Sequence, residues 1–183
     1  MGLRVAQFLA IVLTALALVP AGAHLFELPN KIGLAEHDYF VVQSIYRGWA
    51  LFGIVLFGAL AANLVLAIMV RRQRASFWWA FAAFGLVAAT LVIFFTWTYP
   101  ANQATSNWTV VPANWQELRT RWEYAHAANA VLTFLALCAV TWSAGASARA
   151  RFDSGRRFTK EAGAQSEQVS HVRSAGAGPR GIA

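Results

Sequence analysis

Four stretches of this chain contain no charged residue, and they constrain its fold more than any other feature. They cover residues 5–26, 48–70, 76–116 and 124–148. A helix needs about 20 apolar residues to cross the hydrocarbon core of a bilayer. The third stretch turns polar after Pro100, so it holds one crossing followed by a loop. None shows the alternation of a barrel strand, and the sequence therefore predicts four transmembrane helices.

The composition favours a membrane protein over a soluble one. Of the 183 residues, 58% are hydrophobic and 13% are charged, whereas soluble domains average about 25% charged residues. A chain this short has too large a surface-to-volume ratio to hide so many apolar side chains from water. The composition therefore argues against a soluble enzyme and against a disordered chain.

We predict an all-α fold, a four-transmembrane-helix bundle in residues 1–148. Pro29 is expected to break the first helix, because proline cannot donate a backbone hydrogen bond. Residues 149–183 are rich in Gly, Ala, Ser and Arg and are predicted to form a basic, disordered cytoplasmic tail. The four helices are expected at about 4–28, 39–70, 76–99 and 114–145.

The basic residues lie mainly on one side of the predicted bundle. The side that holds both termini sums to +8 and the opposite side to −1, within a net charge of +7. Because Lys and Arg favour cytoplasmic loops, both termini are predicted to be cytoplasmic, in a bacterial inner membrane. The basic residues flank hydrophobic spans, so no nucleic-acid partner is expected. Aromatic belts are predicted at both membrane boundaries. The outer belt comprises Trp49, Trp97, Trp108, Trp115 and Trp122. The inner belt comprises Trp78, Trp79 and Trp142.

The first stretch also permits a different interpretation. Arg4, an apolar run and the small residues 21–23 resemble a secretory signal peptide with its cleavage site. Cleavage there would leave three helices and His24 as the N-terminal residue, which can bind copper through its amine and its ring. An uncleaved first helix instead provides a scaffold that holds the polar residues 24–27 beside the fourth helix.

Two His/Glu pairs are expected at the outer ends of the first and fourth helices. His24 and Glu27 form His-x-x-Glu, and Glu123 and His126 form Glu-x-x-His. A spacing of three places both members of a pair on one helix face. Because the two helices are antiparallel, the pairs can face each other and enclose one site.

Such a site offers two imidazoles and two carboxylates to a single metal ion. Soluble dimetal bundles use Glu-x-x-His with further Glu residues that are absent here, so a mononuclear site is the more natural one. Fe, Cu, Zn and Mn all accept these ligands. Haem held by His24 and His126 is a less favoured alternative, since it leaves the carboxylates unused. Ordinary salt bridges, of His24 with Glu27 and of Glu123 with Arg119, are another alternative.

Three further side chains complete the predicted site. Tyr46 and Arg47 lie at the start of the second helix, with Gln43 and Tyr39 at spacings of three and four. Arg119 lies one turn before Glu123. We assign Arg119, Tyr46 and Arg47 as candidate catalytic residues, with either arginine orienting an anionic or phenolic oxygen.

The segment from Phe95 to Asn129 carries a recognisable pattern. It includes Phe95-Thr-Trp-Thr-Tyr-Pro100, Asn107-Trp108, Pro112-Ala-Asn114-Trp115 and His126-Ala-Ala-Asn129. With His24-Leu-Phe-Glu27-Leu-Pro29, this pattern resembles the anthrone-oxygenase-like family of small four-helix membrane proteins. The resemblance covers about residues 5–142. It implies oxidation of polycyclic phenolic compounds without an organic cofactor, and it does not identify the catalytic residues.

Two functions follow as hypotheses. The first is a metal-dependent, oxygenase-like oxidoreductase that acts on a lipophilic substrate at the outer membrane face. The second is a non-catalytic membrane subunit or a binding protein for a quinone, pigment or haem. The expected partners are the lipid bilayer, a lipophilic small molecule, and a second copy of the chain or a larger membrane complex.

Overall fold

The computed structural model describes residues 1–176, which are mainly helical and include no strand. Residues 177–183 lie outside this description, and beyond Ala150 side chains are described only for Phe152 and Arg156. The chain divides into two units, Met1–Ala144 and Gly145–Ala183. The all-α prediction is confirmed.

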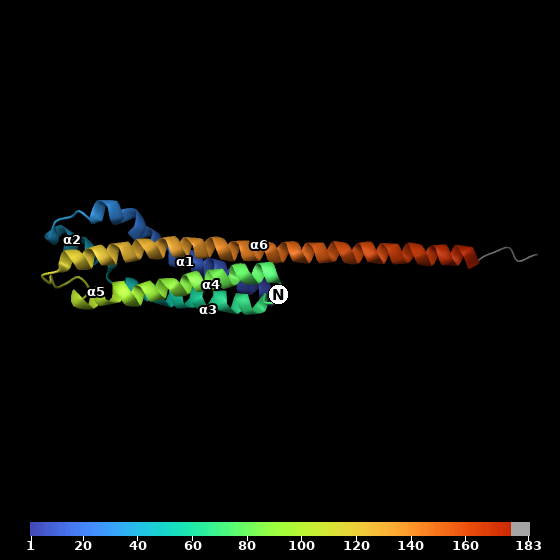
Figure 1. Cartoon of the computed structure of the whole chain (residues 1–183), viewed down its shortest axis with the longest axis horizontal. Helices are drawn as coiled ribbons and strands as arrows, with labels where there is room; N and C mark the ends of the chain where they lie inside the picture. The colour runs from blue at the N-terminus through green and yellow to red at the C-terminus, as the bar shows by residue number, and fades with distance from the viewer. Residues whose placement is uncertain (177–183) are drawn as a thin grey trace, which may run out of the picture. The chain divides into compact units, whose positions relative to one another are not determined.

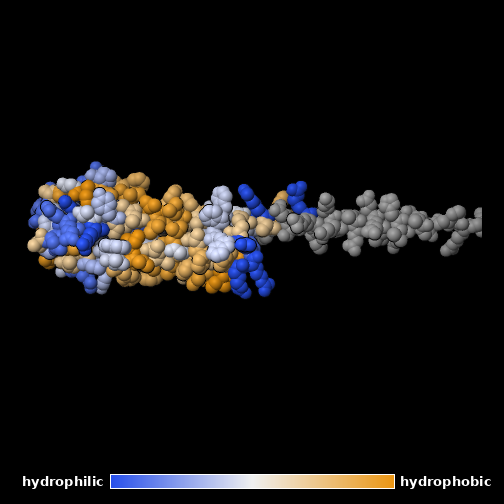
Figure 2. All heavy atoms as spheres, in the orientation of Figure 1, coloured by the Kyte–Doolittle hydropathy of each residue, from blue (hydrophilic) through white to orange (hydrophobic). Residues whose placement is uncertain are grey.

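Within residues 1–176, four helical segments are long and apolar enough to cross a membrane, as predicted. Their surface is hydrophobic around the middle of unit 1 and hydrophilic at the end that holds the short helices α2 and α5 (Figure 2). The four long helices, labelled in Figure 1, are α1 (Gly2–Lys31), α3 (Phe52–Met69), α4 (Arg74–Ile93) and α6 (Trp115–Gly176).

The first helix does not end at Pro29, so this prediction is wrong. α1 continues to Lys31 and contains both Pro20 and Pro29. Because Pro29 lies in the last turn, its missing N–H removes a single hydrogen bond, and the amide of Ile32 still bonds to the carbonyl of Leu28. The added turn carries Lys31 onto the face of the helix that holds Glu27.

The predicted second helix, 39–70, is interrupted, and four separate helical segments take its place. The turn between them is made by Gly48, whose φ of +88° is a left-handed conformation that glycine adopts without strain. This turn separates the first two pieces from the last two. The pieces are α2 (Glu36–Gln43), the 3₁₀ turns η1 (Ser44–Tyr46) and η2 (Trp49–Leu51), and α3.

The predicted third helix extends past its expected end through a local change of winding. α4 is followed by a π-helical segment, η3 (Phe94–Thr98), and then by α5 (Tyr99–Ala104). Pro100 has no N–H to offer the carbonyl four residues earlier, which favours the wider winding just before it. π-Helical segments are frequent at functional sites.

The predicted disordered tail is helical as far as it is described. Within unit 2, α6 continues to Gly176. Arg and Ala are frequent in this segment, which also contains Lys, Gln and Glu, and all five residue types have high helix propensity. The prediction of disorder followed from the lack of large apolar residues, whereas helix propensity favours the observed helix. The part of the tail in 177–183 lies outside the described residues.

Small residues hold the four long helices together in one half of unit 1. A buried cluster draws on all four, with the alanines allowing close approach of the backbones. We call this half the arginine end, because Arg4, Arg71, Arg72 and Arg74 lie beside it, and the half that holds α2 and α5 the polar end. The cluster comprises Ala10, Leu66, Ala67, Val70, Ala80, Ala83, Ala139 and Val140.

Candidate functional site

The structure brings the two predicted His/Glu pairs together at the polar end. The imidazole rings of His24 on α1 and His126 on α6 lie 4.1 Å apart, centre to centre. His24 Nδ1 lies 2.8 Å from Glu27 Oε1, and Glu123 is fully buried. The antiparallel placement of α1 and α6 therefore produces the expected meeting of the pairs.

A lysine that the sequence analysis left in a loop lies between the two carboxylates. Lys31 is 2% exposed, and its Nζ lies 3.0 Å from Glu123 Oε1 and 3.5 Å from Glu27 Oε1. The ammonium also donates a 2.8 Å hydrogen bond to the hydroxyl of Tyr46 and lies 4.6 Å from the centre of the Trp122 ring. One internal cation therefore contacts both carboxylates and offsets part of their charge.

Tyr39 is a second residue of this network that the sequence analysis did not assign to the site. Its side chain is completely buried, and its hydroxyl donates a 2.9 Å hydrogen bond to Glu123 Oε1. Gln43 Nε2 donates in turn to the Tyr39 hydroxyl at 2.8 Å. The predicted shared face of the second helix thus reaches the buried carboxylate of the fourth.

Both tyrosine hydroxyls of the network are held in their protonated form. Burial, followed by the nearby carboxylate of Glu123, raises the pKa of Tyr39 above its ordinary value of 10.0. Burial and the hydrogen bond to Glu27 raise the pKa of Tyr46 in the same direction. The two phenols therefore remain neutral hydrogen-bond donors throughout the physiological pH range.

The tryptophans expected in an outer belt divide into two groups. Trp108, Trp115 and Trp122 are buried and pack with Tyr39, whereas Trp97 remains exposed. The indole N–H groups of Trp108 and Trp122 both donate to Asn102 Oδ1, at 3.1 and 2.8 Å. The three buried rings therefore make internal ring contacts, and those of Trp108 and Trp122 also make internal hydrogen bonds.

The loop after α5 has an unusual backbone. Ser106, Asn107 and Trp108 all have positive φ, between 47° and 64°, which is uncommon for residues other than glycine. The hydroxyl of Thr105 accepts a hydrogen bond from the Trp108 amide at 3.0 Å and helps to hold this turn. Such strain persists only where the surroundings enforce it, and it is frequent at functional sites.

A cavity of about 860 Å³ lies beside this network, within unit 1. Both histidines, Tyr46 and the strained loop line it, and its walls include seven aromatic residues besides Tyr46 and the histidines. The volume is within the range of small-molecule sites, which are mainly apolar with a few placed polar groups. The aromatic residues are Phe40, Trp49, Phe52, Phe57, Phe94, Trp108 and Trp122.

Three polar side chains on this wall have a buried atom without a hydrogen-bond partner among the described residues. These atoms are Gln43 Oε1, Thr98 Oγ1 and Asn129 Oδ1. Native structures leave few buried polar groups unsatisfied, and a bound ligand is one explanation for such groups. Thr98 belongs to the π-helical segment η3, which places its side chain at the cavity.

The three predicted catalytic residues have different positions. Tyr46 and Arg47 line the cavity. Arg119 does not, since its guanidinium donates to the carbonyl of Leu34 at 2.7 Å and lies 4.6 Å from the centre of the Trp115 ring. In this arrangement Arg119 connects α6 to the chain between α1 and α2.

The predicted metal site has no support from the arrangement of its ligands. In the part of the chain with described side chains, no three His, Cys, Asp or Glu residues are grouped so that they could hold a metal ion. The ammonium of Lys31 lies between the carboxylates of Glu27 and Glu123. A metal ion shared by these carboxylates would need that position and would be repelled by the positive charge. The metal and haem hypotheses therefore stay predictions.

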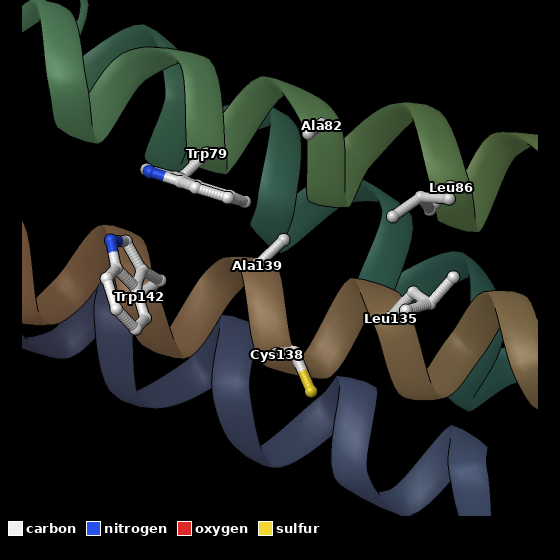
Figure 3. Close-up of a pocket in the computed structure, with 7 residues that line it drawn as sticks. All are labelled: Trp79, Ala82, Leu86, Leu135, Cys138, Ala139 and Trp142. Carbon is white, nitrogen blue, oxygen red and sulfur yellow. The ribbon is translucent and has the colours of Figure 1, made fainter.

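A second, smaller cavity between α4 and α6 differs in chemistry. Its volume is about 310 Å³, and Figure 3 shows Trp79 and Trp142 at one end and Leu86 and Leu135 at the other. Cys138, the only cysteine of the sequence, lines it and is exposed. With no charged or hydrogen-bonding group beyond the indoles and the thiol, this cavity offers little for the recognition of a polar ligand.

No family model matches this chain, and no curated protein or solved structure matches it.

Proposed function

We propose that this chain is an integral membrane protein that binds a lipophilic ring compound, of quinone or phenol type, in the cavity at its polar end. The observation that carries the proposal is the wall of that cavity. It combines seven aromatic residues with two histidines and three partly unpaired polar side chains. Aromatic faces stack on a planar ring, and the polar groups orient its oxygen atoms.

The depth of the cavity supports a lipophilic ligand. On α6 it extends from Trp122 to Thr133, which is about 16 Å along a helix axis. Thr133 and the residues near it lie within a segment able to cross a membrane. The ligand therefore reaches into the hydrocarbon zone while its oxygens remain near the polar end.

The distribution of charge supports the orientation expected from the sequence. We place the polar end at the outer membrane face and both termini in the cytoplasm, because Arg71, Arg72 and Arg74 lie at the opposite end of the bundle. A bacterial inner membrane is the proposed location. The ligand then enters from the outer leaflet or from the outer aqueous side.

An oxygenase-like oxidoreductase is the second candidate, and one contact favours it. The carboxylate of Glu27 lies 2.8 Å from His24 Nδ1 and leaves the other ring nitrogen for the cavity. A carboxylate that orients an imidazole in this way is the usual partner of a histidine general base. With a phenolic substrate and dioxygen as the oxidant, this arrangement agrees with the resemblance to anthrone-oxygenase-like proteins.

Ring binding is tested with 2-methyl-1,4-naphthoquinone and protein purified in dodecyl maltoside. Since Trp49, Trp108 and Trp122 line the cavity, saturable quenching of tryptophan fluorescence is expected. Gly53 lies on the cavity wall, and a Cβ added there meets nothing within 4 Å. The variant Gly53→Phe is therefore expected to fill the cavity and weaken binding at least about tenfold.

Gly85→Phe is the matched control. Gly85 also lies in a helix, with nothing within 4 Å of an added Cβ, and it does not line the cavity. Its affinity for the quinone is expected to equal that of the wild type. Absence of saturable quenching, or equal affinities for the two glycine variants, contradicts ring binding in this cavity.

The second candidate is tested by oxygen consumption. A hydroxylated anthrone is added to the purified protein, and His24→Gln is expected to abolish any protein-dependent uptake of oxygen. Elemental analysis of the same preparation tests the metal prediction separately. A stoichiometric Fe, Cu, Zn or Mn content would support that prediction, and a metal-free active preparation would contradict it.

A further inference from the structure

Among the described residues that line the large cavity, only Arg47 has a side chain with a permanent charge. No Asp, Glu or Lys lines it among the residues whose side chains are described. The two carboxylates behind the wall, those of Glu27 and Glu123, both contact Lys31, and Glu27 also contacts His24 and Tyr46. The cavity therefore presents one positive charge without an opposing carboxylate on its wall.

Arg47 differs in this respect from the other basic residues of the polar end. Lys31 contacts Glu123, Arg119 donates to the carbonyl of Leu34, and Arg121 pairs with Glu117 at 2.6 Å. The guanidinium of Arg47 has neither an ion pair nor a hydrogen bond to any residue of the described part of the chain. A guanidinium presents its donors in a fork that fits two oxygens of a carboxylate.

The backbone fixes Arg47 at one end of the cavity. Its amide bonds to the carbonyl of Ser44 at 3.2 Å, and Gly48, with its left-handed conformation, turns the chain directly afterwards into η2 and α3. The cavity wall continues along α3 to Phe57, about 7 Å beyond Phe52. Arg47 thus lies at the rim, and the apolar part of the wall lies deeper in the bundle.

From this distribution we propose that the ligand is an amphipathic monoanion. Its acidic oxygen group, a carboxylate or an enolate, contacts Arg47, and its ring lies among the aromatic residues of the deeper wall. This inference rests on the proposed function, because it names the chemical class of the ligand in the same cavity. Tyr46, His24, Gln43 and Asn129 then contact the uncharged oxygens of the ring.

A modest energy is expected for the contact with Arg47. The side chain is exposed, so water and salt weaken its attraction for an anion. We expect a preference of about fivefold to tenfold for an anion over a neutral ligand of the same shape. The preference decreases as the salt concentration rises.

The experiment compares two naphthoquinones of nearly equal shape. One is 2-hydroxy-1,4-naphthoquinone, which is an enolate anion at neutral pH, and the other is 2-methoxy-1,4-naphthoquinone, which is neutral. Both are titrated into the full chain in dodecyl maltoside, with tryptophan quenching as the readout. The wild type is expected to bind the anion about fivefold to tenfold more tightly than the neutral compound.

Three arginine variants test the assignment to Arg47. Arg47→Gln is expected to remove the preference by weakening binding of the enolate more than binding of the methoxy compound, while Arg47→Lys retains part of the preference. Arg121→Gln is the control, because Arg121 is exposed at the same end but is paired with Glu117 and does not line the cavity. It is expected to keep the full preference.

The outcomes separate this inference from the function on which it rests. Equal affinity of the wild type for both compounds overturns the inference and leaves ring binding intact. An equal loss for both compounds in Arg47→Gln also overturns it, since that result assigns a structural role to Arg47. Absence of saturable binding for both compounds overturns the proposed function, and the inference with it.

Discussion

The two ends of the bundle are stabilised by different interactions. At the arginine end, alanines and a few aliphatic residues from four helices pack closely. At the polar end, a buried network of Lys31, Glu123 and Tyr39 connects α1, α2 and α6. A cavity of about 860 Å³ lies beside the second arrangement, whereas the cavity next to Ala139 of the first is about 310 Å³.

This difference indicates how a small membrane bundle can keep a cavity open. Small residues let helices approach closely, and close approach leaves little space between them. Buried charges and large rings require partners at fixed distances, so they hold helices apart as well as together. The polar end therefore combines local rigidity with space for a ligand.

The largest effect is expected when the polar network loses its cation. The variant Lys31→Met leaves the fully buried Glu123 without its ion pair. Breaking a buried pair from one side costs about 3–5 kcal/mol, and we expect a loss of that size in the free energy of unfolding in mild detergent. Thermal unfolding followed by circular dichroism measures it.

A matched control comes from the surface of the same end. Arg121→Gln breaks the exposed pair with Glu117 and is expected to cost less than about 1 kcal/mol. The double variant Lys31→Met/Glu123→Gln is expected to recover part of the loss, because it removes the uncompensated charge. Equal effects of Lys31→Met and Arg121→Gln would contradict a buried network.

A smaller effect is expected from overfilling the arginine end. Ala80 is fully buried in the small-residue cluster, and Ala80→Leu is expected to cost about 1–3 kcal/mol because the helices must separate. Ala82 lies on the same helix and lines the smaller cavity, so Ala82→Leu is expected to leave the free energy of unfolding nearly unchanged. Similar thermal stability of the two variants would argue against close packing at Ala80.

The smallest effect concerns a polar contact away from the polar end. Asn63 on α3 donates a 3.0 Å hydrogen bond to Thr14 on α1, and both side chains are buried. Hydrogen bonds between membrane helices contribute on average about 0.6 kcal/mol. We expect a loss of about that size for Thr14→Val. A loss comparable with that of Lys31→Met would remove the contrast between the two ends.

Much of the fold was predictable because membrane spans depend on local composition. The charge-free stretches predicted the four helices that are long and apolar enough to cross a membrane. The interruption at Gly48 was missed, because a glycine at the start of an apolar stretch is compatible both with a continuous helix and with a turn. The helix from 149 to Gly176 was missed because its composition suits both disorder and a helix.

The candidate site was predictable only in part. The spacing of three predicted that His24 and Glu27 share a face, and the antiparallel order predicted their meeting with His126. Lys31 was missed because Pro29 was expected to end the helix before it. The spacing of four between Glu27 and Lys31 was the signal that identifies the ion pair.

The sequence by itself determined which segments can cross a membrane and which residues share a helix face, because both properties depend on neighbours along the chain. Only the tertiary structure decided that Lys31 lies between two carboxylates, that three tryptophans are buried and that one arginine lines the cavity alone. Those contacts join residues separated by as many as 92 positions, as Lys31 and Glu123 are. Local sequence patterns do not predict contacts between residues so far apart in the chain, because those contacts depend on the packing of α1, α2 and α6.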